Sequence, residues 1–214
     1  MELLGGILSM KVLDLCSGLG GFSSAFINDN KWEVMRIENN PLLSEVPDTE
    51  IIDIFEFRDT LSDMMDRGYE PAKVDLILAS PPCREFSLGF NAPRAIASRE
   101  GRLEEYQPCM KILECVLEII DLLQPRHYII ENVQGSTRYF EPYLGYHKCS
   151  IGSFYFYGKF PSFKPGLQGK IPNKSKMDKG SNHPLRLQYR ALIPLPISKA
   201  IKKAVESQTS LFNF

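Results

Sequence analysis

The chain has 214 residues, of which 43% are apolar and 24% are charged, and its formal net charge is −1; this is typical of a soluble globular protein with one domain and at most a small appendage. Its five cysteines include no CxxC pair, and its three histidines have no metal-ligand spacing, so we expect no metal site, no disulfide framework and a reducing, cytoplasmic compartment. No apolar run approaches the ~20 residues that a membrane span needs, and the N-terminus lacks the features of a secretory signal, so we expect no membrane association.

Apolar runs and amphipathic stretches alternate along the chain and predict the following elements. The first strand, residues 11–16, leads directly into the glycine-rich segment 17–21, after which residues 22–26 are expected to begin a helix. Further strands are expected at residues 32–37, 51–52, 74–79, 127–130 and 153–157. Further helices are expected at residues 54–67, 106–123 and 197–205. Alternating strands and helices predict an α/β fold whose mostly parallel sheet has helices on both faces.

Polar residues of chemical interest follow the predicted strands at their carboxyl ends. They are Cys16 with Gly18, Gly20 and Gly21 after the first strand, Glu38 after the second, Asp53 after the third, Cys83 after the fourth and Glu131 after the fifth. In an open parallel sheet this edge is where ligands bind. The sequence therefore predicts one functional site built from five strand ends.

The segment Asp14-Leu-Cys-Ser-Gly-Leu-Gly-Gly21 is a glycine loop between a strand and an expected helix. Ser23 stands where a dinucleotide-binding loop has its third glycine, and Glu38 lies 20 residues after Gly18, a distance suited to ribose hydroxyls. These features favour a nucleoside cofactor without a pyrophosphate, with a structural tight turn as the alternative. Asp53 could accept a hydrogen bond from an adenine amino group or cap the helix that follows it.

The segment Ser80-Pro-Pro-Cys-Arg-Glu-Phe-Ser87 presents a cysteine at a strand end after two prolines. Most cysteines are small buried apolar residues, and we interpret Cys109 and Cys115, inside the predicted helix, in this way. Cys83 differs because a strand end after Pro-Pro exposes its thiol, and the neighbouring Arg84 favours the thiolate. The sequence therefore predicts that Cys83 is a nucleophile.

Glu131 emerges from the apolar run His127-Tyr-Ile-Ile-Glu-Asn-Val133 beside Asn132. A carboxyl group in apolar surroundings favours its protonated form, which suits proton donation. A turn or helix-capping carboxylate is the alternative interpretation. We expect Glu131 to act together with Cys83.

The charges are unevenly distributed along the chain. Residues 1–147 carry 13 Lys and Arg against 24 Asp and Glu, whereas residues 148–214 carry 12 against 2. This basic third predicts contact with a polyanion, through lysines 159, 164, 170, 174, 176 and 179 among others, whereas a solvated lysine-rich surface is the alternative. Contact with a nucleic acid should weaken steeply with salt.

Together the motifs DLCSGLGG, SPPCREFS and ENV resemble, in order and spacing, those of the cytosine-5 DNA methyltransferases, many of them restriction-modification enzymes. The resemblance implies a Rossmann-like methyltransferase fold, DNA as substrate, catalysis by Cys83, Glu131 and Asn132, and S-adenosyl-L-methionine as cofactor. It implies a cofactor site formed by Asp14, Cys16, Gly18, Gly20, Gly21, Phe22, Glu38, Asp53, Ile54 and Pro81. It also implies nucleic-acid contacts by Arg84, Ser87, Arg99, Lys164, Arg186 and Arg190, with residues 84–102 forming a loop that closes over the base. The implied organisation is a catalytic and cofactor-binding domain at 1–147, a small basic irregular segment at 148–190 and a C-terminal helix at 191–214 that returns to the catalytic domain.

The sequence departs from the family pattern at several positions. Cys16 stands where the family usually has Phe, Arg84 where it has Gln, and no arginine pair follows Tyr157-Gly158. Lys164, Arg186 or Arg190 are the candidates to replace the arginine that holds the cytosine carbonyl. Only about 25 residues stand where a target-recognition domain usually lies, too few for a module that reads several base pairs in the major groove. We therefore expect weak or very short sequence specificity, unless a partner protein supplies it.

Other functions remain as alternatives. A degenerate methyltransferase fold could act as a nucleic-acid-binding or regulatory subunit, and one branch of the family acts on tRNA, so RNA is a possible substrate. An amino-directed methyltransferase would have an aromatic residue at Cys83. A cysteine hydrolase would need a histidine beside Cys83, whereas His127 precedes its strand and should lie at the opposite edge of the sheet.

Overall fold

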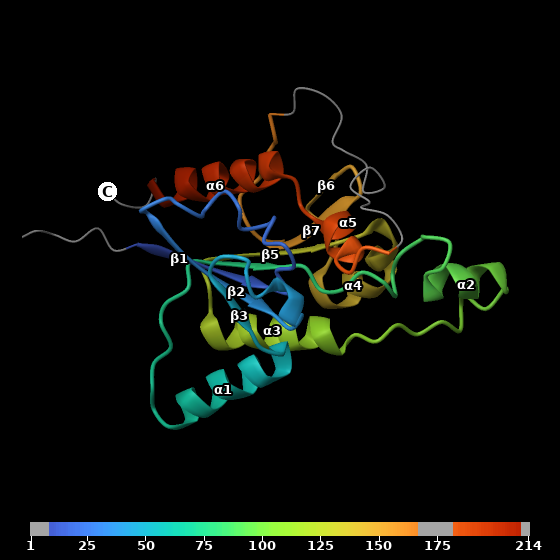
Figure 1. The fold of residues 1–214 in the computed structure, drawn as a ribbon, viewed down its shortest axis with the longest axis horizontal. Helices are drawn as coiled ribbons and strands as arrows, with labels where there is room; N and C mark the ends of the chain where they lie inside the picture. Colours follow the sequence, from blue (N-terminus) through green and yellow to red (C-terminus); the bar gives the residue numbers. More distant parts are fainter. Residues whose placement is uncertain (1–8, 167–181, 211–214) are drawn as a thin grey trace, which may run out of the picture.

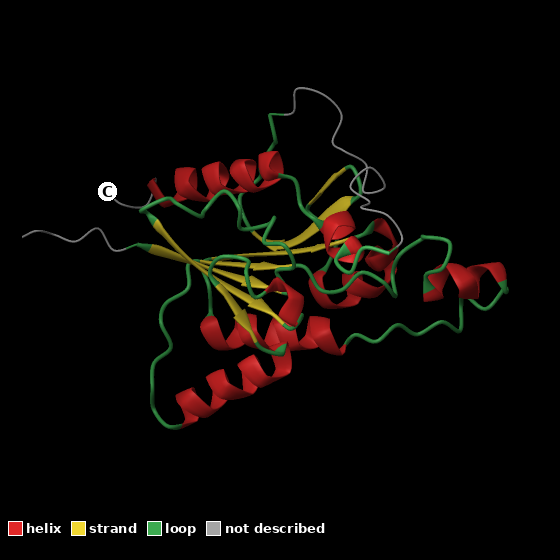
Figure 2. Ribbon diagram, viewed as in Figure 1, coloured by secondary structure: helices red, strands yellow, loops and turns green. Residues whose placement is uncertain are grey.

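A computed structural model describes residues 9–166 and 182–210 and shows a single seven-stranded sheet. Its strands are β1 (Met10–Leu15), β2 (Trp32–Glu38), β3 (Thr49–Ile51), β4 (Leu76–Ala79), β5 (His127–Asn132), β6 (Cys149–Ile151) and β7 (Phe154–Lys159). The spatial order is β3-β2-β1-β4-β5-β7-β6. The first five strands are parallel, whereas β7 runs antiparallel to both β5 and β6. Figure 2 shows this twisted sheet between layers of helices.

The helices cover both faces of the sheet, with α6 on one side and α1 and α3 on the other (Figure 1). The α-helices are α1 (Ile54–Asp66), α2 (Pro93–Arg99), α3 (Lys111–Leu123), α4 (Thr137–Leu144), α5 (Arg186–Ala191) and α6 (Leu195–Ser210), with short 3-10 turns η1 (Pro41–Leu43) and η2 (Gln134–Ser136). The predicted α/β fold with a mostly parallel sheet is therefore confirmed. In the described ranges no helix has both the length and the apolar character that crossing a membrane requires.

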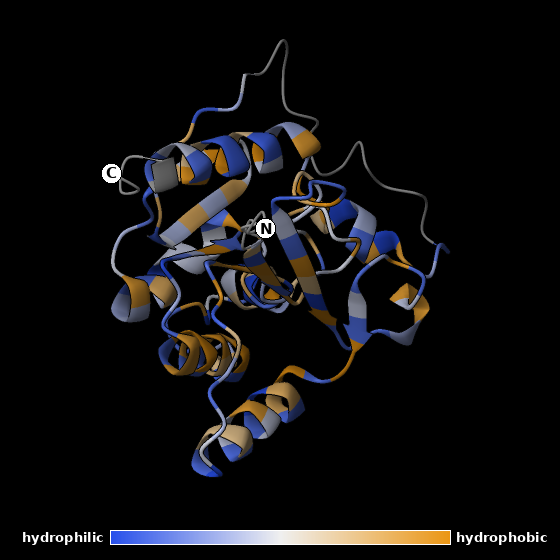
Figure 3. Cartoon of the chain, turned by 90° about the vertical axis from the view of Figure 1, so that its left-hand side faces the viewer, coloured by the Kyte–Doolittle hydropathy of each residue, from blue (hydrophilic) through white to orange (hydrophobic). Residues whose placement is uncertain are grey.

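Successive side chains of each strand point to opposite faces of the sheet, so the core forms two clusters, one on each face. Ile77 and Ala79 of β4 face the side that α1, α3 and α4 cover, whereas Leu76 and Leu78 face α6. On α6, Ile197, Ile201 and Val205 recur every four residues and are fully buried, which gives the alternating bands visible in Figure 3. Burying each such side chain stabilises the fold by about 1.5–3 kcal/mol, and this holds α6 against β1, β4, β5 and β7.

The predicted strands all form, and the expected C-terminal helix extends beyond its predicted range to residues 195–210. The expected strand at residues 153–157 is β7, and the sequence missed its partner β6. Residues 149–159 thus add two antiparallel strands to the main sheet.

The helix expected from Phe22 is wrong, because residues 21–28 form a series of turns. The cause is Ser198 of α6, whose hydroxyl donates to the Phe22 carbonyl at 2.6 Å and accepts from the Ala25 N–H at 3.0 Å. In an α-helix these two groups would pair with residues four positions away. The C-terminal helix therefore occupies the backbone groups that a local helix would have used.

The helix expected from Tyr106 begins only at Lys111. Residues before it are held by Glu85, which lies two residues after Cys83: the Tyr106 hydroxyl donates to the Glu85 carbonyl, and the Cys109 N–H donates to the Glu85 carboxylate. Pro108, which lacks an N–H, lies between these two contacts. This extended segment braces the turn after β4.

Candidate active site

The candidate active site lies where β1, β4 and β5 end side by side. Leu15 pairs with Ala79, and Ala79 pairs with Ile130, so the residues that follow these pairs lie side by side at the carboxyl edge of the sheet. They are Cys16, Ser80 and Glu131. The fold thus brings the glycine loop, the Pro-Pro-Cys segment and the ENV segment to one edge of the sheet, as expected for a parallel sheet.

Cys83 lies in a tight turn at the end of β4. Its carbonyl accepts hydrogen bonds from the N–H groups of Phe86 and Ser87, at 3.1 and 3.0 Å. The side chain keeps its thiol and is half-buried. Pro81, which precedes it, is buried, whereas Arg84, which follows it, is exposed. The turn therefore places a half-buried Cys83 at the edge of the sheet.

Asn132 ties this turn to β5. Its Nδ2 donates to the Pro81 carbonyl at 2.9 Å, and its Oδ1 accepts from the Val133 N–H at 2.9 Å. The side chain is fully buried, and the adjacent Glu131 is only 5% exposed. Because both polar atoms of Asn132 bind backbone, it is a positioning residue that fixes the Cys83 turn against the strand carrying Glu131.

A second brace lies between the Cys83 turn and η2. A Cβ added to Gly135 would lie 1.9 Å from the Phe86 carbonyl oxygen, which is backbone. The Phe86 ring is buried and meets Phe140 of α4 edge-on at 5.1 Å. Only glycine allows this close approach, so Gly135 determines where the turn sits. Gly135 was not predicted as a site residue, although it follows the ENV motif by only two residues.

The glycine loop rests on a buried polar network that includes Asp14. The Ser23 hydroxyl donates to Asp14 Oδ2 at 2.6 Å and accepts from Arg36 Nε at 2.8 Å. Arg36 also donates to the Gly20 carbonyl at 3.0 Å and to the Pro47 carbonyl at 2.7 Å. All three side chains are buried. Asp14 was predicted from the sequence as a cofactor-site residue, whereas Ser23 and Arg36, which fix the loop from its buried side, were not.

The three glycines of this loop differ in their surroundings. Added Cβ atoms would meet the Arg36 guanidinium at Gly20, and Leu192 and Ile193 at Gly21, all within 3 Å. At Gly18, which has a φ of +54°, an added Cβ would meet nothing within 4 Å. Cys16 also has a positive φ, of 54°, and burial raises the pKa of its thiol well above the usual range. The loop is therefore tightly packed against the protein at Gly20 and Gly21, whereas the space beside Gly18 is open.

Glu38 and Asp53 flank the loop at the ends of β2 and β3. Glu38 Oε2 accepts from the Gly18 N–H at 2.8 Å, and its Oε1 accepts from the Asn39 and Asn40 N–H groups at 3.1 and 3.0 Å. Asp53 caps α1 by accepting from the Phe55 N–H at 2.9 Å. A carboxylate oxygen can accept more than one hydrogen bond, so Glu38 Oε2 can still receive a hydroxyl beside Gly18. These carboxylate acceptors and the open space at Gly18 fit the hydroxyl and amino groups of a nucleoside.

Two predicted cofactor residues lie in the core. Phe22 is 2% exposed and packs near Phe156, 6.1 Å between ring centroids, while its carbonyl binds Ser198. Ile54 is 6% exposed at the start of α1. Their contribution to a ligand site would be to support the loops that form it.

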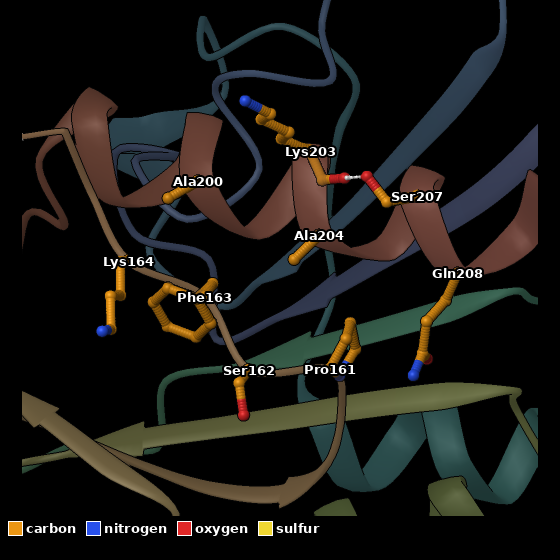
Figure 4. Close-up of a pocket in the computed structure, with 9 residues that line it drawn as sticks. All are labelled: Pro161, Ser162, Phe163, Lys164, Ala200, Lys203, Ala204, Ser207 and Gln208. Carbon is orange, nitrogen blue, oxygen red and sulfur yellow. Dashed lines mark hydrogen bonds between the residues drawn. The ribbon is translucent and has the colours of Figure 1, made fainter.

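The predicted nucleic-acid contacts are spread over several elements. Ser87 Oγ accepts from the Gly89 N–H, and the Arg99 guanidinium lies 4.1 Å from the Phe90 ring centroid. Arg186 and Arg190 lie on α5. Lys164 lines a surface groove with Lys203 and Ala200 of α6, on the face of the sheet that α6 covers (Figure 4). Lysines 170, 174, 176 and 179 lie outside the described residues.

Other chemistries have less structural support. His127 begins β5, four residues before Glu131 along the strand, and thus lies at the opposite edge from Cys83. Among residues 9–166 and 182–210, no group of three His, Cys, Asp or Glu is arranged to hold a metal ion.

Comparison with known proteins gives a match to one family. The C-5 cytosine-specific DNA methylase model matches residues 10–138. The type II methyltransferase M1.HphI of Haemophilus parahaemolyticus is 29% identical over 163 residues, which cover 67% of this chain and 41% of that protein. The type II methyltransferase M.AquIA of Picosynechococcus is 26% identical over 139 residues, which cover 60% of this chain and 50% of that protein. The chain therefore spans about half the length of these curated relatives, or less.

Among solved structures, human methyltransferase-like protein 13 in complex with SAH is 13% identical, with a TM-score of 0.40. The alignment covers 93% of this chain and 83% of that chain.

Proposed function

Because the chain belongs to the C-5 cytosine-specific DNA methylase family, we propose that it methylates carbon 5 of cytosine in DNA. The observation that carries this proposal is the hydrogen bond from Asn132 Nδ2 to the Pro81 carbonyl. It joins the turn that bears Cys83 to the strand that bears Glu131, so a nucleophile and a proton donor reach the same edge of the sheet.

The chemistry explains why both groups are needed. Carbon 5 of cytosine is a poor nucleophile. The Cys83 thiolate attacks carbon 6 while the Glu131 carboxyl protonates ring nitrogen 3, and the ring becomes an enamine whose carbon 5 is nucleophilic. After carbon 5 has gained a methyl group, its proton passes to solvent water, the Cys83 thiolate is expelled from carbon 6, and nitrogen 3 returns its proton to Glu131. The low exposure of Glu131 keeps water away from the proton that Glu131 exchanges with ring nitrogen 3.

The glycine loop would hold the methyl donor, S-adenosyl-L-methionine. When bound, this group supplies an electrophilic methyl on a sulfonium. Gly18 offers the open backbone, Glu38 accepts hydrogen bonds from the ribose hydroxyls, and Asp53 lies at the end of the neighbouring strand for the adenine. Arg36, Ser23 and Asp14 keep the loop in place from the buried side.

We further propose that sequence specificity is weak or very short in this chain. The support is the small number of residues between β7 and α5, which leaves little material for reading base pairs. A protein partner would be the source of any longer specificity. Trapping of the chain on 5-fluorocytosine, in DNA and separately in RNA, distinguishes the proposed substrate from a tRNA-directed activity.

The test is transfer of a tritiated methyl group to mixed-sequence duplex DNA by the wild type, Cys83→Ser and Cys109→Ser. We expect Cys83→Ser to reduce transfer by at least about a thousandfold, because a serine hydroxyl is far less nucleophilic at neutral pH. Cys109 is an exposed cysteine in the extended segment before α3, and its substitution should leave transfer within about threefold of the wild type. Transfer that survives the loss of Cys83 contradicts the mechanism.

A further inference from the structure

A surface groove lies between α6 and residues 161–164, the segment that follows β7 (Figure 4). Its volume is about 390 Å³. The segment starts at the amino edge of the sheet, because β7 ends where Lys159 pairs with Tyr128, near the start of β5. The Cys83 turn lies at the carboxyl edge, so the proposed methyl transfer makes no use of this groove.

Apolar side chains form the floor and one wall of the groove. The Phe163 ring is 8% exposed and meets the Phe156 ring edge-on, with 5.4 Å between the ring centroids. Ala200 and Ala204 lie about one turn apart on α6 and line the wall opposite the segment. Because these two side chains are small, the space between the helix and the segment stays open.

The backbone of residues 161–164 is available for pairing. The segment contains no helix, turn or bend, and none of its N–H or C=O groups is hydrogen-bonded to another described residue. Its side chains alternate, because Phe163 is buried whereas Ser162 and Lys164 are exposed, and this is the period of a β-strand. Such a segment is a template to which a further strand can be added.

Two lysines determine the charge of the groove. Lys164 and Lys203 line it and are exposed, and neither forms an ion pair with another described residue. Lys202, on the same helix, instead pairs with Asp29 and Glu206. Among the described residues that line the groove there is no Asp or Glu, so an occupant with carboxylates complements its charge.

We propose that this groove binds an acidic peptide segment of a partner protein, which pairs with residues 162–164 as an added strand. Successive side chains of a strand point to opposite sides, so apolar side chains on one side cover Phe163 while carboxylates at the other positions reach Lys164 and Lys203. The unpaired backbone groups favour a peptide over a nucleic acid, because only a peptide supplies the N–H and C=O groups of a strand. The inference is independent of the proposed methyl transfer.

The probe is a fluorescein-labelled peptide of about ten residues, the length of a long strand, in which Asp and Leu alternate. Its binding to the full chain is measured by fluorescence anisotropy. Three matched peptides replace Asp by Lys, replace Leu by Ser, or carry methyl groups on alternate backbone nitrogens. The protein variants are Lys203→Glu and Ala204→Gln. Lys111→Glu is the control, because it makes the same charge change at an exposed position on α3, which covers the other face of the sheet.

We expect the Asp-Leu peptide to bind the wild type with a Kd of about 1–100 µM. Lys203→Glu should weaken binding about fivefold or more, because it replaces an attraction by a repulsion. Ala204→Gln should weaken binding about tenfold or more, because the longer side chain fills the groove. Lys111→Glu should stay within about twofold of the wild type.

The matched peptides test each part of the proposed contact. The Lys-Leu, Asp-Ser and N-methylated peptides should each bind about tenfold or more weakly, because they lack the carboxylates, the apolar side chains and the backbone donors, respectively. Bound Asp-Leu peptide should also slow hydrogen exchange of the amides of residues 162–164.

Binding that Lys203→Glu leaves unchanged, or that survives backbone methylation, overturns the proposal, and so does an Asp-Leu peptide that fails to bind at about 1 mM. A single-stranded oligonucleotide is the competing probe. If it slows exchange at residues 162–164 and the Asp-Leu peptide does not, the groove is a nucleic-acid site and the proposal is wrong. Thermal melts show whether Ala204→Gln folds, and the exposed Lys203 keeps the test decisive if it does not.

Discussion

Asp14 is a fully buried carboxyl group beneath the glycine loop, and its environment determines its charge. Burial raises its pKa from the usual 3.8 to about 6, while the hydrogen bond from Ser23 and the charge of Arg36 act in the opposite direction. The carboxyl group therefore changes charge close to neutral pH. Its position under Ser23 and Arg36 makes the stability of the glycine loop depend on pH.

Asp14→Asn tests this dependence of stability on pH. Because the folded pKa of Asp14 lies above the unfolded one, its contribution to the free energy of unfolding is complete below about pH 4 and is lost as the pH rises through 6. Relative to Asp14→Asn, the wild type should lose up to about 3 kcal/mol between about pH 4 and pH 7. Urea unfolding of both proteins at several pH values measures this difference in the free energy of unfolding. A difference that does not vary with pH contradicts the raised pKa of Asp14.

The Cys83 turn is positioned by contacts with three neighbouring elements: β5, η2 and the segment before α3. Asn132 binds the Pro81 carbonyl, Gly135 admits the Phe86 carbonyl, and Glu85 binds Tyr106 and the Cys109 N–H. Each contact links segments that are at least 21 residues apart in sequence. Cys83, the proposed nucleophile, is therefore held in place by neighbouring elements as well as by its own turn.

Gly135→Ala tests this arrangement. The new methyl group would overlap the Phe86 carbonyl oxygen, so the turn must shift, at a cost of about 1–3 kcal/mol in the free energy of unfolding. Methyl transfer should fall about tenfold or more, because small displacements of a reacting group are costly. Gly166→Ala is the matched control, because an added Cβ there meets nothing within 4 Å. Thermal melts and methyl transfer that match this control would show that η2 does not position the turn.

The sequence predicted those parts of the site that depend on local patterns. The apolar strands and the residues at their ends could be found because burial on both faces produces continuous apolar runs. The contacts of Ser198 with Phe22 and Ala25 could not, because their partners lie 173 and more residues away. Those contacts also explain why a helix was wrongly expected after the glycine loop. Gly135 and Arg36 were missed for the same reason: their effect depends on a tertiary neighbour.

The charged residues of the whole molecule are unevenly distributed: residues 1–147 are acidic on balance, and the C-terminal third, residues 148–214, is basic. Of the basic residues in this third that the structure describes, Lys164 and Lys203 flank the groove beside α6, and Arg186 and Arg190 lie on α5. The C-terminal third also contains β7 and α6, which belong to the core. The same segment thus completes the fold and supplies positive charge at its surface.

The salt dependence of DNA binding tests the role of this charge. If three or more basic side chains contact phosphates, a plot of log K against log salt concentration should have a slope of about −3 or steeper. Fluorescence anisotropy with a mixed-sequence duplex between 50 and 300 mM salt would measure it, with Arg186→Gln and Arg190→Gln each expected to reduce the slope by about one. A flat dependence means that these side chains are only solvated.

The contacts of Ser198 set an order of events during synthesis. The backbone groups of residues 22 and 25 that the Ser198 hydroxyl pairs with are made 173 or more residues before it. Until α6 has been made, the Phe22 carbonyl and the Ala25 N–H lack the partner that the folded chain gives them. Residues 21–28 therefore reach their native turns only once α6 can pack against them.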